Sequence, residues 1–236
     1  MKQLERRSKS VLIYGGSRGV GNLIAEHLGA KGLDVLVIAR NSAPPASNVT
    51  SVELDISTLE GQIKNHEILT QHKELKLVFF NIGGSFGIHQ RIPTSDNFMS
   101  IFERNFLYVL TTIKFLHDSN SLSQKVLGFM LTNALRTKNS NIAYLISKLA
   151  VEEYANYLSQ PIKHNPKGVL KFYPPLILYP GRYLADSYLS QTTLHERQKF
   201  VETELGGEWP VTPEELAAEI AEQLIAAVRE ERQPKG

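Results

Sequence analysis

The chain has 236 residues, and 26 lysines and arginines against 24 aspartates and glutamates give it a formal net charge of +2. This surplus is too small to argue for nucleic acid as a partner. The absence of cysteine excludes disulfides, thiolate metal sites and a cysteine nucleophile. The seven histidines are scattered without ligand spacing, so we predict no metal site. Nowhere do eighteen apolar residues run together, and no signal-peptide core follows the basic N-terminal tail, so we expect a cytoplasmic protein without membrane contact.

Short apolar runs alternate with helical patterns along the whole chain. This alternation predicts one α/β domain over residues 1–236, a doubly wound, Rossmann-type parallel sheet of about six strands with helices on both faces. The predicted strands lie near 11–14, 34–39, 50–54, 76–81, 125–132 and 168–173, and the predicted helices near 19–31, 57–64, 96–118, 142–158 and 213–229.

The first predicted strand, 11–14, breaks into a glycine-rich turn before a helical pattern resumes. Gly15 permits the tight exit from the strand, Gly19 lets the backbone approach a phosphate, and Gly21 allows close packing of helix on strand. The amino terminus of the helix then faces a pyrophosphate with free N–H groups and a favourable dipole. With the second strand at 34–39, this βαβ unit predicts a dinucleotide site.

The end of the second predicted strand carries Ala39 and then Arg40. Enzymes that choose NAD place a carboxylate there, which bonds the ribose hydroxyls and repels a 2′-phosphate. Arg18, inside the glycine turn, is close enough to bind the same phosphate with charge-assisted bonds. The alternative is a pair of surface arginines, and their joint placement favours NADPH.

Within the predicted helix at 142–158, Tyr144 and Lys148 are four residues apart and therefore point the same way. An ammonium beside a phenol favours the phenolate, so we expect the pKa of Tyr144 to be lowered toward neutrality. The spacing alone is common, and a helix surface pair is the alternative.

Several motifs resemble those of short-chain dehydrogenases/reductases, in the same order, over roughly residues 10–180. Tyr14 to Gly21 resembles the family's Thr-Gly-x-x-x-Gly-x-Gly, with tyrosine in place of threonine. Leu54-Asp55-Ile56 resembles the segment after the third strand whose aspartate contacts adenine, and Asn81-Ile82-Gly83-Gly84 resembles Asn-Asn-Ala-Gly. Tyr144 and Lys148 match two members of the catalytic tetrad.

The resemblance implies the remaining tetrad members and their roles. Asn105 falls where the central helix carries the tetrad asparagine, which would position a water that relays protons to Lys148. The family serine is missing, and Thr132 is the best substitute, with Asn133 as a possible stand-in donor. Tyr144 would donate a proton to a carbonyl oxygen held by Thr132, while NADPH delivers hydride to the carbon.

The resemblance also implies a set of cofactor contacts and an assembly. We expect a homodimer through the helices near 96–118 and 142–158, with small-molecule carbonyls or alcohols as substrates. The expected dimer contacts are Phe106, Leu110, Ile113, Leu149 and Tyr157. The expected NADP(H) contacts are Gly15, Ser17, Arg18, Gly19, Val20, Gly21, Arg40, Asp55, Ile56, Asn81, Gly83 and Lys148.

The C-terminal region departs from the family pattern. A predicted helix at 213–229 leaves no sequence for the usual final strand, and either Pro174-Pro175 or Pro180-Gly181 replaces the family's Pro-Gly. The segment 179–212 is expected to form a substrate lid. Two alternatives remain open: a cofactor-binding sensor with little turnover, and a nucleotide-sugar epimerase or dehydratase, for which the chain looks short.

Overall fold

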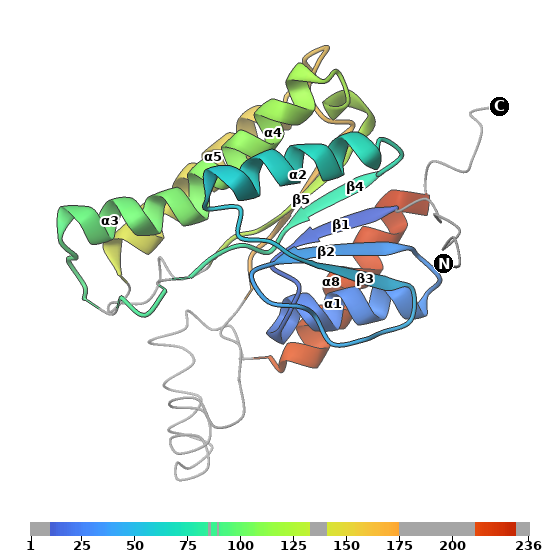
Figure 1. Ribbon diagram of the computed structural model, residues 1–236, viewed down its shortest axis with the longest axis horizontal. Coiled ribbons are helices and arrows are strands. Elements are labelled where there is room, and N and C mark those ends of the chain that lie inside the picture. Colours follow the sequence, from blue (N-terminus) through green and yellow to red (C-terminus); the bar gives the residue numbers. More distant parts are fainter. Residues whose placement is uncertain (1–9, 85, 89, 133–140, 175–210, 230–236) are drawn as a thin grey trace, which may run out of the picture.

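The computed structural model describes residues 10–84, 86–88, 90–132, 141–174 and 211–229 (Figure 1). In chain order the elements are β1 (Val11–Tyr14), α1 (Gly19–Ala30), β2 (Val35–Ala39), β3 (Val49–Glu53), α2 (Leu59–Gln71), β4 (Leu77–Phe80), α3 (Ser95–Phe102), the π-helical turn η1 (Glu103–Leu107), α4 (Tyr108–Asp118), the 3₁₀ turn η2 (Leu122–Gln124), β5 (Val126–Met130), α5 (Ile142–Leu158), β6 (Gly168–Phe172) and α8 (Pro213–Arg229).

The strands form one parallel sheet in the order β3-β2-β1-β4-β5-β6. The chain winds outward from β1 in one direction as far as β3, and returns to start the other half at β4. The carboxyl ends of β1 and β4 therefore flank the topological switch point, where ligands bind in open α/β sheets. This arrangement confirms the predicted doubly wound α/β fold.

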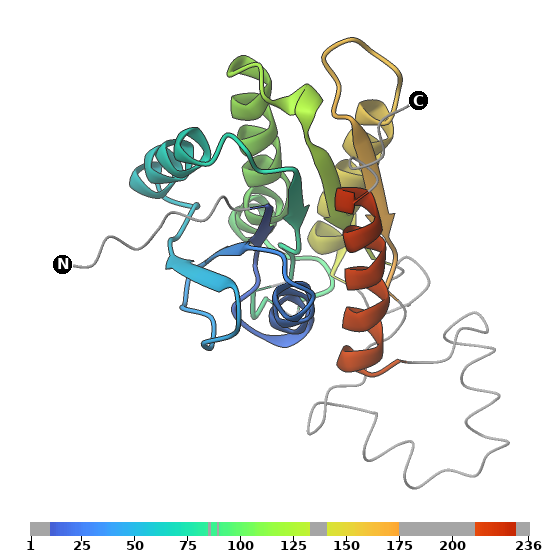
Figure 2. The same ribbon diagram turned by 90° about the vertical axis from the view of Figure 1, so that its right-hand side faces the viewer.

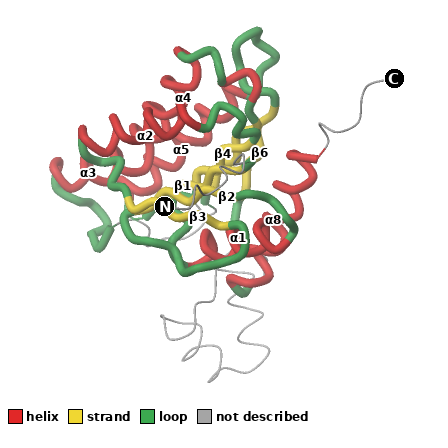
Figure 3. Tube along the Cα trace, turned by 45° about the vertical axis from the view of Figure 1, so that its right-hand side comes forward, coloured by secondary structure: helices red, strands yellow, loops and turns green. Residues whose placement is uncertain are grey.

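Helices cover both faces of the sheet, as Figures 2 and 3 show. Successive side chains of a strand point to opposite faces, so Val11 and Ile13 pack in a core with α1 and α8, while Leu12 lies in a second core with α2, α4 and α5. Because both faces of the central strands are buried, these strands read in the sequence as unbroken apolar runs.

Tyr14, which stands where the family motif has threonine, is a core residue. Its side chain is 1% exposed, and its ring stacks on Phe80 with centroids 5.3 Å apart. Its hydroxyl donates to Oδ1 of Asn65 at 2.7 Å, and Asn65 in turn donates to the hydroxyl of Thr112 at 3.4 Å. The tyrosine thus ties β1 to α2 and α4 and points away from the glycine turn.

Two predicted helices differ from the structure. The helix predicted at 57–64 begins at Leu59, because Thr58 caps it by accepting from the Gly61 N–H at 3.0 Å, and it continues to Gln71 because Asn65 and Leu69 both face the core. The helix predicted at 96–118 is interrupted by η1, where the N–H of Tyr108 bonds the carbonyl of Glu103, five residues back.

One residue expected at a dimer surface lies in the core. Ile113 is 1% exposed, because this side of α4 packs on the sheet. Leu149 and Tyr157 are 38% and 55% exposed, and the same outer side of α5 also carries Ile142 and Ile146. In the part of the chain that the structure describes, no helix is long and apolar enough to cross a membrane.

Candidate active site

The glycine turn is held from the neighbouring strand by Asn81. Its side-chain amide donates to the carbonyl of Gly15 at 2.8 Å, and its backbone N–H donates to the carbonyl of Tyr14 at 3.0 Å. Gly15 has φ of +80°, and a Cβ on Gly21 would overlap the Asn81 amide and the Gly15 carbonyl. Larger residues at these two positions would therefore push the turn out of place.

The amino terminus of α1 is available for a ligand. Its N-cap residue, Arg18, makes no side-chain capping bond, and no acidic residue lies in the first turn. Arg18 is exposed. Unpaired N–H groups at a helix amino terminus bind anions well, because the helix dipole adds to their hydrogen bonds.

Lys148 is buried between the carboxyl ends of β4 and β5. Its Nζ donates to the carbonyls of Ile82 at 2.8 Å and Met130 at 2.7 Å, and the residue is 4% exposed. A Cβ on Gly83 would lie 2.5 Å from Nζ, so glycine at this position makes room for the lysine. Burial lowers the pKa of Lys148 from 10.5 to about 7.

Tyr144 lies one helical turn before Lys148, beside Thr132. Burial raises the pKa of Tyr144, and a hydrogen bond with the Thr132 side chain partly opposes this effect. The expectation that Lys148 lowers the pKa of Tyr144 is therefore wrong in this structure, because the lysine is directed to two backbone carbonyls and burial of the phenol dominates. Asn133 lies outside the described residues.

Asn105 sits in η1 and is fully buried. Its Oδ1 accepts from the N–H of Gly84 at 3.1 Å, and its Nδ2 donates both to the carbonyl of Gly84 at 3.1 Å and to Oγ of Ser147 at 3.0 Å. Ser147 then donates to the carbonyl of Tyr144 at 2.7 Å. The asparagine thus joins the loop after β4 to the helix that carries Tyr144 and Lys148, and both of its amide donors are in use.

Sequence reasoning missed Asn141, which caps α5. Its Oδ1 accepts from the N–H groups of Ala143 at 2.9 Å and Tyr144 at 3.2 Å, while its amide donates to the carbonyls of Ile88 at 3.0 Å and Gln90 at 2.8 Å. An asparagine directly before a helical pattern is a capping signal, but nothing in the sequence indicates its second partner, the loop after β4.

A cluster of charged and aromatic side chains borders the turn after β3. The guanidinium carbons of Arg40 and Arg104 lie 5.6 and 5.1 Å from the ring centroid of Phe86. Burial would raise the pKa of Asp55, but hydrogen bonds from Ser57 and the charges of both arginines hold it below its usual value. Arg40 and Asp55 were predicted from the sequence, whereas Phe86 and Arg104 were not predicted to bind the cofactor.

The remaining predicted contacts lie in the glycine turn, in α1 and after β3. Ser17, Gly19 and Val20 lie in the glycine turn and the first turn of α1, and Ile56 follows Asp55 after β3. The predicted lid at 179–212 falls almost entirely outside the described residues, as does the Pro180-Gly181 alternative.

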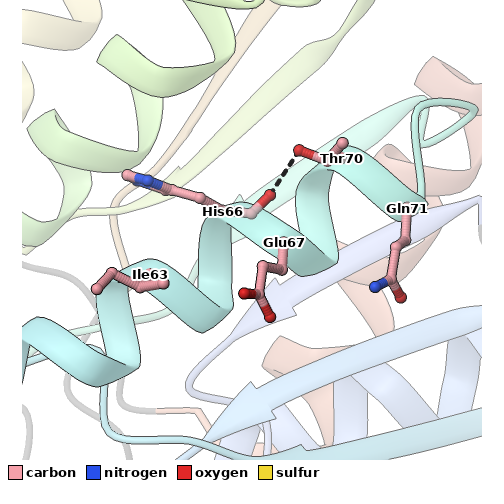
Figure 4. Close-up of a pocket in the computed structure, with 5 residues that line it drawn as sticks. All are labelled: Ile63, His66, Glu67, Thr70 and Gln71. Carbon is pink, nitrogen blue, oxygen red and sulfur yellow. Dashed lines mark hydrogen bonds between the residues drawn. The ribbon is translucent and has the colours of Figure 1, made fainter.

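A shallow surface hollow on α2 is not part of this arrangement (Figure 4). It is lined by residues of that one helix, Ile63, His66, Glu67, Thr70 and Gln71, and includes none of the residues at the strand ends. Its histidine ring stacks on Phe115, with centroids 4.1 Å apart. Within the described residues, no group of three or more histidine, aspartate or glutamate side chains could hold a metal ion.

The fold and these motifs define a nucleotide-binding oxidoreductase class, and comparison with known proteins gives the family. A sequence model described as short chain dehydrogenase matches residues 9–170. The chain belongs to the short-chain dehydrogenase/reductase family.

Individual relatives are more distant. The chain is 31% identical over 114 residues to carbonyl reductase family member 4 of Xenopus laevis, and the match spans 45% of this chain and 48% of that protein. The chain therefore spans about half the length of this curated relative. A short chain dehydrogenase family protein from Francisella tularensis is similar in structure, with a TM-score of 0.68, 20% identity, and coverage of 94% of this chain and 91% of that one. The RhlG/NADP active-site complex of Pseudomonas aeruginosa has a TM-score of 0.67, 20% identity, and coverage of 95% and 92%.

Proposed function

We propose that this protein is an NADPH-dependent oxidoreductase that reduces a carbonyl to an alcohol, or catalyses the reverse reaction. The observation that carries the proposal is the joint placement of Tyr144, Thr132 and Lys148 at the carboxyl ends of β4 and β5, next to the glycine turn. A sequence relative named as a carbonyl reductase and a structural neighbour named as an NADP complex are consistent with it.

The residues present fit a dinucleotide. The uncapped amino terminus of α1 and the glycine turn suit a pyrophosphate. The end of β2 carries Arg40 and no carboxylate, which suits a 2′-phosphate better than free ribose hydroxyls. We assign Gly15 to Gly21, Arg40, Asp55, Ile56, Asn81, Gly83 and Lys148 to cofactor binding. When bound, the nicotinamide supplies the hydride.

The chain's own residues then handle the proton. In the reducing direction the carbonyl carbon gains the hydride, and the hydroxyl of Tyr144 gives its proton to the carbonyl oxygen. The hydroxyl of Thr132 donates a second hydrogen bond to that oxygen and holds it in place. Lys148 would hold the nicotinamide ribose, and with a pKa of about 7 it can gain or lose a proton near neutrality. Asn105 and Ser147 keep the two segments of the site in register.

A second candidate is a cofactor-binding sensor with little turnover. The raised pKa of Tyr144 favours it, because a phenol that holds its proton tightly is a weaker acid. The two candidates make different predictions for the same variants.

The test is a screen for oxidation of NADPH with ketones, aldehydes, ketosugars and 3-ketoacyl thioesters. With an active substrate, Tyr144→Phe should abolish turnover while leaving NADPH affinity nearly unchanged, and Thr132→Ala should lose about 10²-fold in kcat. Tyr157→Phe, an exposed tyrosine on the same helix, is the matched control. If Tyr144→Phe and Thr132→Ala both turn over like the parent, the reductase mechanism is wrong and the sensor takes its place.

A further inference from the structure

Three elements that are distant in the sequence bring Arg40, Phe86 and Arg104 together. Arg40 follows β2, Phe86 lies in the loop after β4, and Arg104 belongs to η1. Each guanidinium carbon lies over the phenyl ring, 5.6 Å from its centroid for Arg40 and 5.1 Å for Arg104. The backbone of Phe86 adopts φ of +52°, a conformation uncommon for a bulky residue, which supports an interaction that holds it there.

The cluster has more positive than negative charge. Two guanidinium groups repel each other, and among the described residues no carboxylate lies within salt-bridge distance of either one. Asp55 is close enough for both charges to lower its pKa, but its carboxylate already accepts from the N–H of Ser57 at 2.9 Å. A single carboxylate cannot neutralise two arginines, so the cluster suits a further anion.

Contact with the ring does not use up the hydrogen-bond donors of the arginines. Each guanidinium carries five N–H donors, and the attraction to the ring acts on its charge. A phosphate monoester can accept from two guanidinium groups through charge-assisted, bidentate bonds. Contact with Phe86 keeps both guanidinium groups beside the same ring, which lessens the entropy that their long side chains would lose on binding an anion there.

The position of the cluster identifies which phosphate it suits. Arg104 is close to the turn at Asp55, and the hydroxyl of the nearby Tyr108 donates to the carbonyl of Ser57 at 3.3 Å. This turn follows β3 on the half of the sheet beyond β1, and Arg40 directly follows β2, the strand between β1 and β3. A nucleotide lying across the switch point places its adenosine on this half.

We propose that Arg104 and Phe86 join Arg40 in a site for the 2′-phosphate of an adenosine nucleotide. This inference rests on the proposed NADPH-dependent function and adds residues that its sequence motifs do not include. Arg104 contributes a guanidinium from η1 in addition to the predicted Arg18 and Arg40, and Phe86 contacts both Arg40 and Arg104.

Calorimetric titration with two probes tests the site without any substrate. The probes are 2′,5′-ADP, which carries the 2′-phosphate, and 5′-AMP, which lacks it. We expect Arg104→Gln to weaken the binding of 2′,5′-ADP at least about tenfold, which is the loss expected for a charge-assisted bond. The affinity for 5′-AMP should change less than about twofold. Phe86→Leu should also weaken the binding of 2′,5′-ADP but not that of 5′-AMP, although both arginines remain. Arg91→Gln, an exposed arginine near the same loop, should change neither affinity.

The outcomes separate the two proposals. If the parent binds both probes equally, the NADP preference itself is wrong. If the parent prefers 2′,5′-ADP and Arg40→Gln removes the preference but Arg104→Gln does not, only the role of Arg104 is overturned. Arg104→Lys keeps the positive charge but lacks the paired N–H donors of the guanidinium, so it should lose an intermediate amount of affinity for 2′,5′-ADP. This variant also serves if Arg104→Gln fails to fold. An unchanged affinity for 2′,5′-ADP in Arg104→Lys counts against the site.

Discussion

The burial of Lys148 predicts an unusual dependence of stability on pH. Its pKa falls from 10.5 to about 7 in the folded protein. Below pH 7 both the folded and the unfolded chain hold the proton, and the full cost of a buried ammonium is present. Between these two pKa values the unfolded chain keeps its proton while the folded chain has lost it, so the unfolded state binds more protons and stability rises with pH. Above pH 10.5 neither state holds the proton, and the increase in stability is complete.

The size of the effect follows from the same two values. At about 1.4 kcal/mol per pH unit, a fall from 10.5 to about 7 corresponds to about 5 kcal/mol. We take this as an upper limit, because the carbonyls of Ile82 and Met130 accept from Nζ and favour the charged form.

The assay is urea unfolding, followed by far-UV circular dichroism from pH 6 to pH 10, on the parent and on Lys148→Met. Methionine has a similar length but no titrating group, so the difference in free energy of unfolding between parent and variant isolates the lysine. Loss of the two carbonyl bonds adds only a constant offset. Lys114→Met is the control, since the Lys114 side chain is 69% exposed. The reasoning is refuted if the parent-minus-variant difference is flat across this range.

Three further changes test the packing around the site. Asn141→Ala should lower the free energy of unfolding by about 1 kcal/mol for the lost helix cap and raise KM. Asn141→Ser keeps a capping oxygen but has no amide for the carbonyls of Ile88 and Gln90, so it should recover the stability but not the KM. Equal behaviour of the two variants would contradict a role for the bonds to Ile88 and Gln90. Tyr14→Phe should lower the free energy of unfolding by about 1–3 kcal/mol, because it leaves Oδ1 of Asn65 without its donor, and a urea curve matching the parent would count against this bond. Light scattering should show a dimer that dissociates in Leu149→Glu, since Leu149 lies on the exposed apolar side of α5, and a stable tetramer would overturn the assembly.

The sheet could be predicted from the sequence because its signals are local. Strands buried on both faces appear as short apolar runs, and the glycine turn after β1 marks the first change from strand to helix. The helices α5 and α8 begin and end where the sequence predicts, at Ile142–Leu158 and Pro213–Arg229. A residue before the first helical position, Asn141, fixes the start of α5 through its own side chain.

Side-chain direction at the site could not be predicted in the same way. The spacing of Tyr144 and Lys148 fixes only that their Cβ atoms share a helix face. The lysine side chain has four rotatable bonds between Cα and Nζ. The carbonyls that accept from Nζ are those of Ile82, just after β4, and Met130, at the end of β5, and both are distant from Lys148 in the sequence. The substitution of glycine for alanine at Gly83 was visible in the sequence, but its effect depends on the lysine that packs against it.

The π-helical turn η1 links the two ends of the proposed site. Its neighbouring residues Arg104 and Asn105 contact different parts of one loop: Asn105 bonds both backbone groups of Gly84, and Arg104 lies over the ring of Phe86. Consecutive side chains of a helical turn point in different directions, so two neighbouring residues of η1 can contact two different parts of the loop. Because Asn105 also bonds Ser147, which donates to the carbonyl of Tyr144, η1 contacts both the loop after β4 and the helix that carries Tyr144.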